Sequence, residues 1–335
     1  MKLKKIKTVE LIPKAPFNFD ATFHKPAHFP SNDNHWQPGI RWQTWLWSHS
    51  SGQLADSRDK TWKTLGLKFV NKGSLNKPKI DLGIYYKASL SDDFVDSLAQ
   101  EIRYKYNLDL DLSDFYARFK NDKILGPVIK RWKGLRPGHQ GSLYEYLIIG
   151  IVLQNAPVRH SINMLQALFE NYGKLLEYDR KKLWCFWEPG DLRKVKEDEL
   201  RALKIGYRAK SIKKIDDYFA QGKIDEFELR KKNKETQREE LIKLYGVGPA
   251  TVWYLLFDVF HHYDFFDHIS PWEQKIYSKL FFNKDPEKPV PVKKLLKYFE
   301  KYKPYQQLAV HYIWDDLWWK RKNKHIPWLE KLIRV

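Results

Sequence analysis

Alternating apolar and polar positions mark the first 90 residues as β-rich. The runs at 61–70 and 79–86 both alternate, and a turn-like cluster at 71–74 separates them. Proline, threonine, tryptophan and turn-forming residues are frequent throughout residues 1–90. Because alternation with a period of two is typical of strands with one buried face, we expect residues 1–90 to form a small N-terminal β-rich domain.

From residue 91 onward the apolar period becomes that of a helix. Four apolar residues recur at helical spacing directly after this point, namely Phe94, Leu98, Ile102 and Tyr106. Helical patterns then dominate to the end of the chain, which predicts a helical region over residues 91–335. The two parts together predict an α+β fold.

Two capping boxes mark the starts of helices. Residues 142–145 and 270–273 both begin with serine and end with glutamate, so that hydroxyl and carboxylate can satisfy the first main-chain N–H groups of a helix. The first box precedes an apolar helix to about residue 154, and the second precedes a helix to about residue 280. Further helices are expected over 158–169, 196–205 and 306–320.

A glycine turn between two apolar helices is the most informative pattern in the chain. Gly246 and Gly248 flank Val247, and Pro249 begins the next helix. Glycine accepts positive φ and lets the backbone approach a partner closely, while proline suits the first helical turn. The second helix then presents bare N–H groups in front of the turn, which suits a phosphate. Residues 238–260 are therefore predicted to form a helix-hairpin-helix that binds the DNA backbone.

The charge of the chain agrees with a polyanionic partner. Its 335 residues contain 60 Lys and Arg against 41 Asp and Glu, a formal net charge of +19. Such an excess favours nucleic acid, although a basic protein without that partner is the alternative. Hydrophobic residues make up 43% of the chain, which is enough for a sizeable core.

Several classes of site and location are excluded by residue usage. With Cys185 alone, an internal disulfide framework and a four-cysteine zinc or iron–sulfur site are impossible. No cysteine or carboxylate falls at zinc spacing from His261, His262 and His268, so metal catalysis is not expected. The basic N-terminus is not followed by an apolar signal stretch, and the apolar run at 147–153 is too short to span a bilayer. We expect an intracellular protein in the cytoplasm and nucleoid, or in the nucleus, without a membrane partner.

Together, the hairpin and the capped helix at 270–280 resemble the helix-hairpin-helix (HhH-GPD) DNA glycosylase superfamily, in its 3-methyladenine and 8-oxoguanine DNA glycosylase branch. The resemblance covers most of the chain: it is strong over 142–172 and 196–320 and weak over 1–90. It implies two all-α lobes behind the β-rich domain, with a DNA and base cleft between them. The implied function is base excision repair by a monomer that hydrolyses the N-glycosidic bond of a flipped, alkylated or oxidised purine in double-stranded DNA.

The resemblance also implies where DNA would bind. The segment 141–155 is similar to a family helix whose terminal side chains fill the gap left by an extruded base, so Gln154 and Asn155 are candidates for this wedge; an ordinary polar helix end is the alternative. The other candidates for DNA binding are Lys243, Gly246, Val247, Gly248, Ala250, Thr251 and Lys275. In relatives, carbonyls matching those of Ile242, Leu244 and Val247 hold a monovalent cation, K⁺ or Na⁺. No other cofactor is expected.

A base pocket is implied beside the second hairpin helix. Tyr254 lies four residues beyond Ala250 on the same helix face, where alkylation-repair relatives carry an aromatic residue. The segment 303–314 is similar to the C-terminal helix that lines the pocket, which adds Gln307 and His311. Trp272 is a further pocket candidate, with core packing as its alternative.

Two positions depart from the family pattern. Bifunctional relatives have a lysine where this chain has Ala250, so a monofunctional hydrolase with water as nucleophile is favoured over a glycosylase/lyase. The family's catalytic aspartate corresponds to Ser270. Asp267 is the favoured replacement and Glu273 the second, since Glu273 also has a capping role. Alternatively, Ser270 marks a non-catalytic protein that binds damaged DNA.

Overall fold

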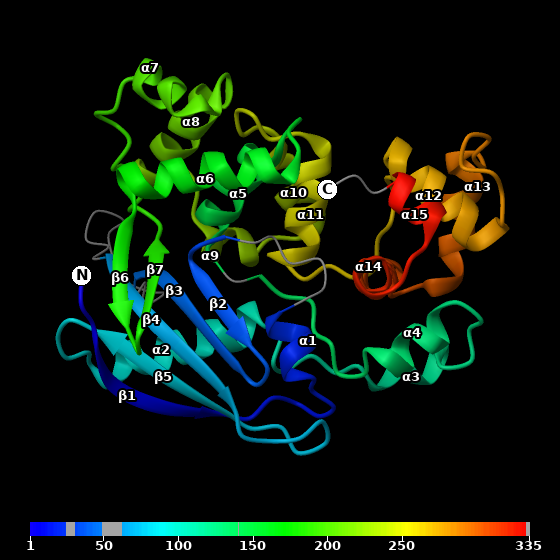
Figure 1. The fold of residues 1–335 in the computed structure, drawn as a ribbon, viewed down its shortest axis with the longest axis horizontal. Coiled ribbons are helices and arrows are strands. Elements are labelled where there is room, and N and C mark those ends of the chain that lie inside the picture. The colour runs from blue at the N-terminus through cyan, green and yellow to red at the C-terminus, as the bar shows by residue number, and fades with distance from the viewer. Residues whose placement is uncertain (25–30, 49–61, 140, 333–335) are drawn as a thin grey trace.

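The N-terminal part of the chain is a five-stranded antiparallel sheet (Figure 1). The structure is a computed structural model that describes residues 1–24, 31–48, 62–139 and 141–332. The strand order is β1-β5-β4-β3-β2. The strands are β1 (Lys4–Leu11), β2 (Asn34–Gln37), β3 (Ile40–Ser48), β4 (Trp62–Asn71) and β5 (Ile80–Tyr86). The alternating runs at 61–70 and 79–86 correctly predicted β4 and β5 within the described residues, and residue 61 lies outside them.

Two helices contribute to the core of this sheet. They are α1 (Phe19–Phe23) and α2 (Asp92–Lys105), and α2 begins where the Ser91 hydroxyl accepts the N–H of Phe94. Phe94 and Leu98 share one hydrophobic cluster with Phe69 and Leu82 of the sheet. The predicted helix at 91–106 is thus confirmed, and its apolar face packs against the sheet. A division into separate domains at residue 90 stays a prediction.

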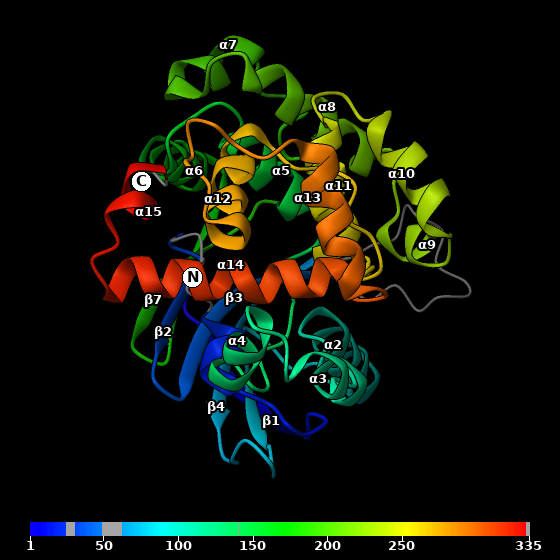
Figure 2. The ribbon, with the colours of Figure 1, turned by 90° about the vertical axis from the view of Figure 1, so that its right-hand side faces the viewer.

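The remaining helices form two groups, of which the second lies on the right in Figure 1 and faces the viewer in Figure 2. The first group is α5 (Leu143–Leu153), α6 (Val158–Tyr172), α7 (Glu197–Leu200), α8 (Arg208–Ala220), α9 (Glu226–Arg230), α10 (Lys234–Ile242) and α11 (Pro249–Asp258). The second group is α3 (Ser113–Phe119), α4 (Leu125–Arg131), α12 (Pro271–Phe282), α13 (Val292–Phe299), α14 (Gln306–Asn323) and α15 (Pro327–Leu332). Both capping boxes start helices as predicted, and the α+β fold class is confirmed. None of the helices in the described ranges is long and apolar enough to cross a bilayer.

One strand hairpin interrupts the helical part of the chain and was not predicted. It consists of β6 (Lys174–Tyr178) and β7 (Lys181–Cys185), joined by Asp179 and Arg180, both with positive φ. Tyr178 donates its hydroxyl to the carbonyl of Gln43 at 2.8 Å, and its ring lies where a Cβ at Gly66 would approach within 2.7 Å. The hairpin therefore fixes the helical part onto β3 and β4.

A buried ion cluster joins α2 to α9. The Arg230 guanidinium donates to the carboxylate of Glu101 at 2.5 and 2.7 Å, and Lys105 pairs with Glu226. Burial alone would raise the pKa of Glu226, but the charges of Lys105 and Arg230 hold it well below its ordinary value. Glu226 also accepts the N–H of Leu143 at 2.6 Å, at the start of α5. The cluster therefore fixes the entry to α5, which forms one wall of the candidate site.

Candidate functional site

The two glycines of the predicted hairpin have different roles in the structure. Gly246 has a φ of +83°, and a Cβ there would approach the Oγ of Ser211, on α8, within 2.5 Å. Gly248 precedes α11 with φ −100° and ψ 171°, and nothing lies within 4 Å of a Cβ built on it. Gly246 is therefore required by backbone conformation and packing, whereas Gly248 faces open space.

The start of α11 leaves main-chain donors available in front of the turn. No side chain caps this helix, and its first turn contains Pro249, Ala250 and Thr251. The first N–H groups of a helix have no acceptor within it, and together with the helix dipole they favour an anion such as phosphate. The geometry thus agrees with the predicted placement of Gly248, Ala250 and Thr251 at a backbone-binding turn.

The wedge candidates lie directly beside this turn. Gln154, at the end of α5, donates its amide to the carbonyl of Gly246 at 2.7 Å. Asn155 has a φ of +48° and donates to the hydroxyl of Tyr207 at 3.1 Å. The Arg208 guanidinium donates to the carbonyl of Gln154. Tyr207, 51% exposed, therefore joins the predicted pair, although no sequence pattern singled it out.

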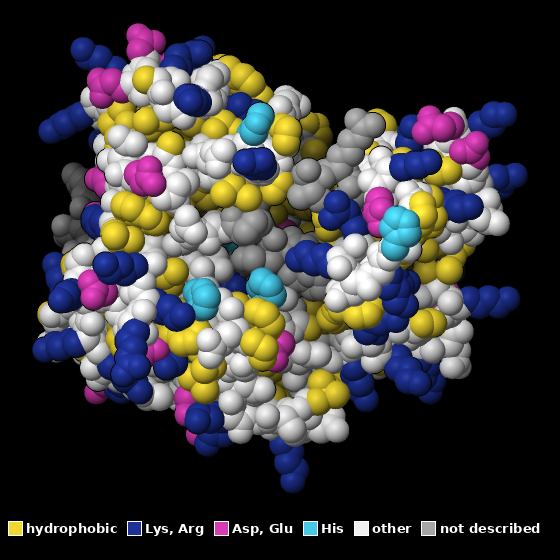
Figure 3. Space-filling model, viewed as in Figure 1, with side chains coloured by type: hydrophobic (Ala, Val, Ile, Leu, Met, Phe, Trp, Pro, Cys, Tyr) yellow, Lys and Arg dark blue, Asp and Glu magenta, His cyan; other side chains and the backbone are white. Residues whose placement is uncertain are grey.

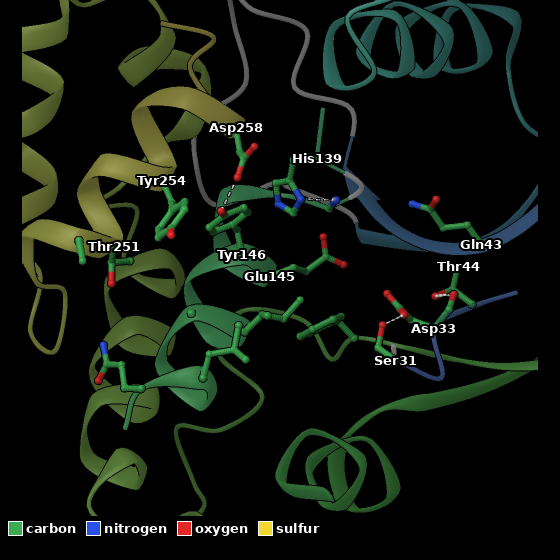
Figure 4. A pocket seen from close by; sticks show the side chains of 17 residues that line it. Ser31, Asp33, Gln43, Thr44, His139, Glu145, Tyr146, Thr251, Tyr254 and Asp258 are labelled. Carbon is green, nitrogen blue, oxygen red and sulfur yellow. Dashed lines mark hydrogen bonds between the residues drawn. The ribbon is translucent and has the colours of Figure 1, made fainter. Parts of the chain in front are cut away.

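A cavity of about 480 Å³ lies behind the hairpin, between α5, α11 and the sheet. This volume falls within the range of small-ligand pockets. One face of α11 lines it with Ala250, Thr251, Tyr254 and Asp258. Figure 4 shows the opposite walls, which include Glu145 and Tyr146 from α5, Gln43 and Thr44 from β3, and Ser31 and Asp33. The helix that starts at the hairpin therefore also forms a wall of the cavity.

Tyr254 and Asp258 from α11, together with Tyr146 from α5, set the chemistry of this side of the cavity. Tyr254 is 42% exposed, and it lines the cavity. Although part of the side chain is exposed, desolvation and the negative charges of Glu273 and Asp258 raise the pKa of Tyr254. Tyr146 donates its hydroxyl to Asp258 Oδ2 at 2.6 Å, and burial together with Asp258 raises the pKa of Tyr146. Both phenols therefore remain neutral near pH 7, with their hydroxyl hydrogens in place.

Two further carboxylates of the cavity are engaged in local structure. Glu145 accepts the N–H of Ser142 in the capping box of α5, and burial raises its pKa to about 7. Asp33 accepts from Ser31 Oγ and, at 2.7 Å, from the amide of Asn34. No lysine or arginine belongs to the described lining of the cavity.

The three predicted catalytic residues lie in different surroundings. Asp267 is exposed and pairs with Arg238 at 2.7 Å, and it does not line the cavity. Ser270 donates its N–H and its hydroxyl to Glu273 Oε2, at 2.9 and 2.6 Å. Glu273 is 6% exposed, and its charge acts on Tyr254. Of the three residues, Glu273 is thus the buried carboxylate; none of the three belongs to the described lining of the cavity, and the assignment of a catalytic role stays a prediction.

Several other predicted residues lie outside the lining of this cavity. Gln307 is 2% exposed and donates its N–H to the carbonyl of Tyr263, and the His311 ring packs 5.2 Å from the Phe257 ring. They are not among the described residues that line this cavity, and their place in a base pocket stays a prediction. Trp272, Lys243 and Lys275 do not belong to this lining either: Trp272 packs against Trp314, Lys243 lines another cavity, and Lys275 pairs with Glu287.

The carbonyl groups of the hairpin turn differ in their main-chain partners. The carbonyl of Leu244 accepts the N–H of Val247 at 3.0 Å. Within the described part of the chain, no main-chain N–H outside the helices donates to the carbonyls of Ile242 or Val247. Such carbonyls can accept a monovalent cation. Among the described residues, no cluster of three His, Cys, Asp or Glu side chains could hold a metal ion.

Comparison with known sequences finds one curated relative. A DNA-3-methyladenine glycosylase of Bacillus subtilis (strain 168) is 28% identical over 152 residues, which make up 45% of this chain and 50% of the relative. The chain thus matches about half the length of this protein. No protein-family model matches the chain.

Solved structures match nearly the whole chain. The 8-oxoguanine glycosylase/lyase of Clostridium acetobutylicum, in complex with double-stranded DNA containing cytosine opposite 8-oxoG, has a TM-score of 0.65 and 20% identity, over 96% of this chain and 98% of that one. The 3-methyladenine DNA-glycosylase of Archaeoglobus fulgidus has a TM-score of 0.70 and 13% identity, over 95% and 100%. At these identities the matches establish the fold.

Proposed function

We propose that this chain is a member of the helix-hairpin-helix DNA glycosylase superfamily and that it hydrolyses the N-glycosidic bond of a damaged purine in double-stranded DNA; the curated relative and the fold of the solved structures support this. One observation carries the proposal: α11 begins at the hairpin turn and lines the cavity with Ala250, Thr251, Tyr254 and Asp258. A strand held at the turn therefore has a cavity of ligand size directly beside it.

DNA would be held by the main chain of the hairpin. A phosphate in front of α11 accepts the N–H groups of its first turn, and Gly248 leaves room for it. Gln154, Asn155 and Tyr207 fill the gap left in the duplex. Lysine and arginine side chains are spread widely over the surface in Figure 3, which agrees with a polyanionic partner. Extrusion is required because the bond cannot be reached inside the base stack.

The cavity would bind the extruded base between aromatic side chains. Tyr254 stands on the α11 wall and Tyr146 on the α5 wall, and both are uncharged donors near pH 7. Stacking on such rings tolerates different purines. The tyrosines therefore supply affinity for a flat base, and the polar groups around them supply selectivity.

Cleavage builds positive charge on the sugar, which a buried carboxylate stabilises. We assign this role to Glu273, because it is 6% exposed and its charge acts on Tyr254, whereas Asp267 is exposed and paired with Arg238. Glu273→Gln should then lower base release by at least about a hundred-fold while DNA binding persists. Asp267→Asn should leave base release near wild type, and the reverse pattern would transfer the role to Asp267.

Water would be the nucleophile. Ala250 has no amine, and no lysine belongs to the described lining of the cavity. A glycosylase/lyase forms a Schiff base that borohydride traps as a covalent DNA adduct. We expect no such adduct, and its appearance would establish the lyase alternative.

A monovalent cation at the hairpin carbonyls is part of the proposal. Ile242, Leu244 and Val247 would hold it, and its charge would draw a DNA phosphate to the turn. Replacing K⁺ with a bulky organic cation at constant ionic strength should then weaken DNA binding. Unchanged affinity would remove the cation from the proposal.

The decisive experiment is a panel of oligonucleotide duplexes with alkylated, deaminated or oxidised purines. Each is incubated with the protein and then treated with alkali, which breaks the strand at abasic sites. Release from at least one lesion is expected. The serine at position 270 favours a second candidate, a non-catalytic protein that binds damaged DNA. Tight binding to an abasic-site analogue with no base release from any lesion would establish that candidate.

A further inference from the structure

Asp258 is a cavity residue that the sequence did not single out. It is the last residue of α11, and it lines the cavity on the same helix face as Thr251 and Tyr254. Figure 4 shows its carboxylate directed toward the hydroxyl of Tyr146, from which Oδ2 accepts at 2.6 Å. The position is set by the helix and by Tyr146 together, so the carboxylate is held in place within the cavity wall.

The other carboxylates of the cavity serve local structure. Glu145 caps α5, and Asp33 accepts from Ser31 and Asn34 within its own turn. Asp258 differs because its helix starts at the proposed phosphate site and continues past Tyr254, the proposed stacking residue. It therefore faces whatever lies beyond the stacked ring of an extruded nucleotide.

The length of α11 determines which part of that nucleotide Asp258 meets. A helix rises about 1.5 Å per residue, so Asp258 lies about 10 Å along the axis from Thr251. With a phosphate at the first turn, the sugar falls beside Thr251 and the purine beside Tyr254. The edge farthest from the glycosidic bond, which carries ring positions 1, 2 and 6, then points to Asp258. Base-extruding enzymes read this Watson–Crick edge by hydrogen bonds.

An ionised carboxylate can only accept hydrogen bonds. Asp258 already acts as an acceptor in the structure, because its Oδ2 accepts the Tyr146 hydroxyl at 2.6 Å. Guanine derivatives present two adjacent donors at this edge, N1–H and the 2-amino group, which match the carboxylate. Adenine derivatives present the N1 lone pair, which the carboxylate repels.

We propose that Asp258 reads the Watson–Crick edge of the extruded base and makes the enzyme selective for damaged guanines over damaged adenines. This rests on the proposed glycosylase function and names its substrate class. Tyr146 acts as a positioning residue, because its hydrogen bond fixes Asp258 Oδ2.

The test compares lesions that differ by a single group. One duplex carries 8-oxoguanine and the other 8-oxohypoxanthine, which lacks only the 2-amino group. Both lesions are attached to a 2′-fluoroarabino sugar that resists cleavage, and the affinity of the protein for each duplex is measured by fluorescence anisotropy. The wild type should bind the guanine lesion at least about ten-fold more tightly. Asp258→Asn should bring this ratio close to one, and Tyr146→Phe should lower it partly. Asp264→Asn, an exposed residue paired with Lys234, is the matched control and should keep the wild-type ratio.

Each outcome bears on a different claim. An unchanged ratio in Asp258→Asn, or no preference in the wild type, overturns the role of Asp258; the wild-type comparison needs no variant to fold. Base release is measured in parallel on ordinary deoxyribose. Absence of release from any lesion, with the binding preference intact, overturns the glycosylase function but supports base reading by Asp258. Release without any binding preference overturns only the inference.

Discussion

Substituting alanine for each hairpin glycine should separate the stability of the fold from DNA binding. Gly246 has a φ of +83°, where an L-residue is strained by about 1–2 kcal/mol. The new Cβ would also lie 2.5 Å from Ser211 Oγ and 2.7 Å from Ser211 Cβ. Ser211 is 5% exposed, and such overpacking costs about 1–3 kcal/mol. Gly246→Ala should therefore destabilise the protein by about 2–5 kcal/mol.

Gly248→Ala should behave differently. Its φ of −100° and ψ of 171° suit any residue, and the Cβ would have no neighbour within 4 Å. Replacing glycine at a helix N-cap lowers the stability by a few tenths of a kcal/mol. Alanine also makes the unfolded chain less flexible, which raises the stability by about the same amount. The free energy of unfolding should therefore change by less than about 0.5 kcal/mol. The methyl group would stand in front of the N–H groups proposed to bind phosphate, so DNA affinity should fall about ten-fold.

The assays are urea unfolding, followed by tryptophan fluorescence, and anisotropy with a fluorescent duplex. A double variant, Gly246→Ala with Ser211→Gly, should recover the overlap part of the loss but not the backbone strain. The reasoning is refuted if Gly248→Ala binds DNA as the wild type does, or if Gly246→Ala is as stable as Gly248→Ala.

Three further predictions concern the ion cluster, the capping box and the cavity. Arg230→Met leaves Glu101 and Glu226 with Lys105 alone and should destabilise the protein by about 3–5 kcal/mol in urea unfolding; a loss below 1 kcal/mol would contradict this reading. The pKa of Glu145 is raised from 4.5 to about 7 in the folded state, so the folded protein binds this proton more tightly than the unfolded chain does. The free energy of unfolding should therefore fall as the pH rises from 4.5 to 7, by at most about 3 kcal/mol. Glu145→Gln should flatten this part of the profile in unfolding measured at pH 5 and pH 8, and an unchanged slope would argue against it. Tyr254→Ala should lower base release at least about ten-fold with little change in thermal stability. Tyr254→Phe is the matched control, and its base release should stay near that of the wild type. Equal losses in the two variants would show that the hydroxyl, rather than the ring, matters.

Local patterns were sufficient to predict most helices and the hairpin. Capping boxes, glycine turns and apolar periods are written within a few residues, so α5, α11 and α12 begin where the sequence indicated. The β6–β7 hairpin was missed because its turn is formed by Asp179 and Arg180 in positive φ, without the glycine that usually signals such turns.

The cavity could be predicted only in part. Tyr254 follows from helical spacing, but Asp258 gains its meaning from Tyr146, which lies 112 positions away in the chain. Asp267 and Glu273 were alternatives because both flank Ser270, and only the packing shows one exposed and the other buried. Contacts between distant segments therefore decide the site, and no local pattern records them.

The docking of Tyr178 against Gly66 limits how this protein can be recombined. In a chimera that takes only its first 90 residues from a relative, Tyr178 would pack against a strand from the relative. Any side chain at the position of Gly66 in that strand would collide with the Tyr178 ring. Transplantation would need to carry the β6–β7 segment along with the N-terminal sheet. The two stretches are thus expected to diverge in concert, although 87 positions separate the last residue of one from the first of the other.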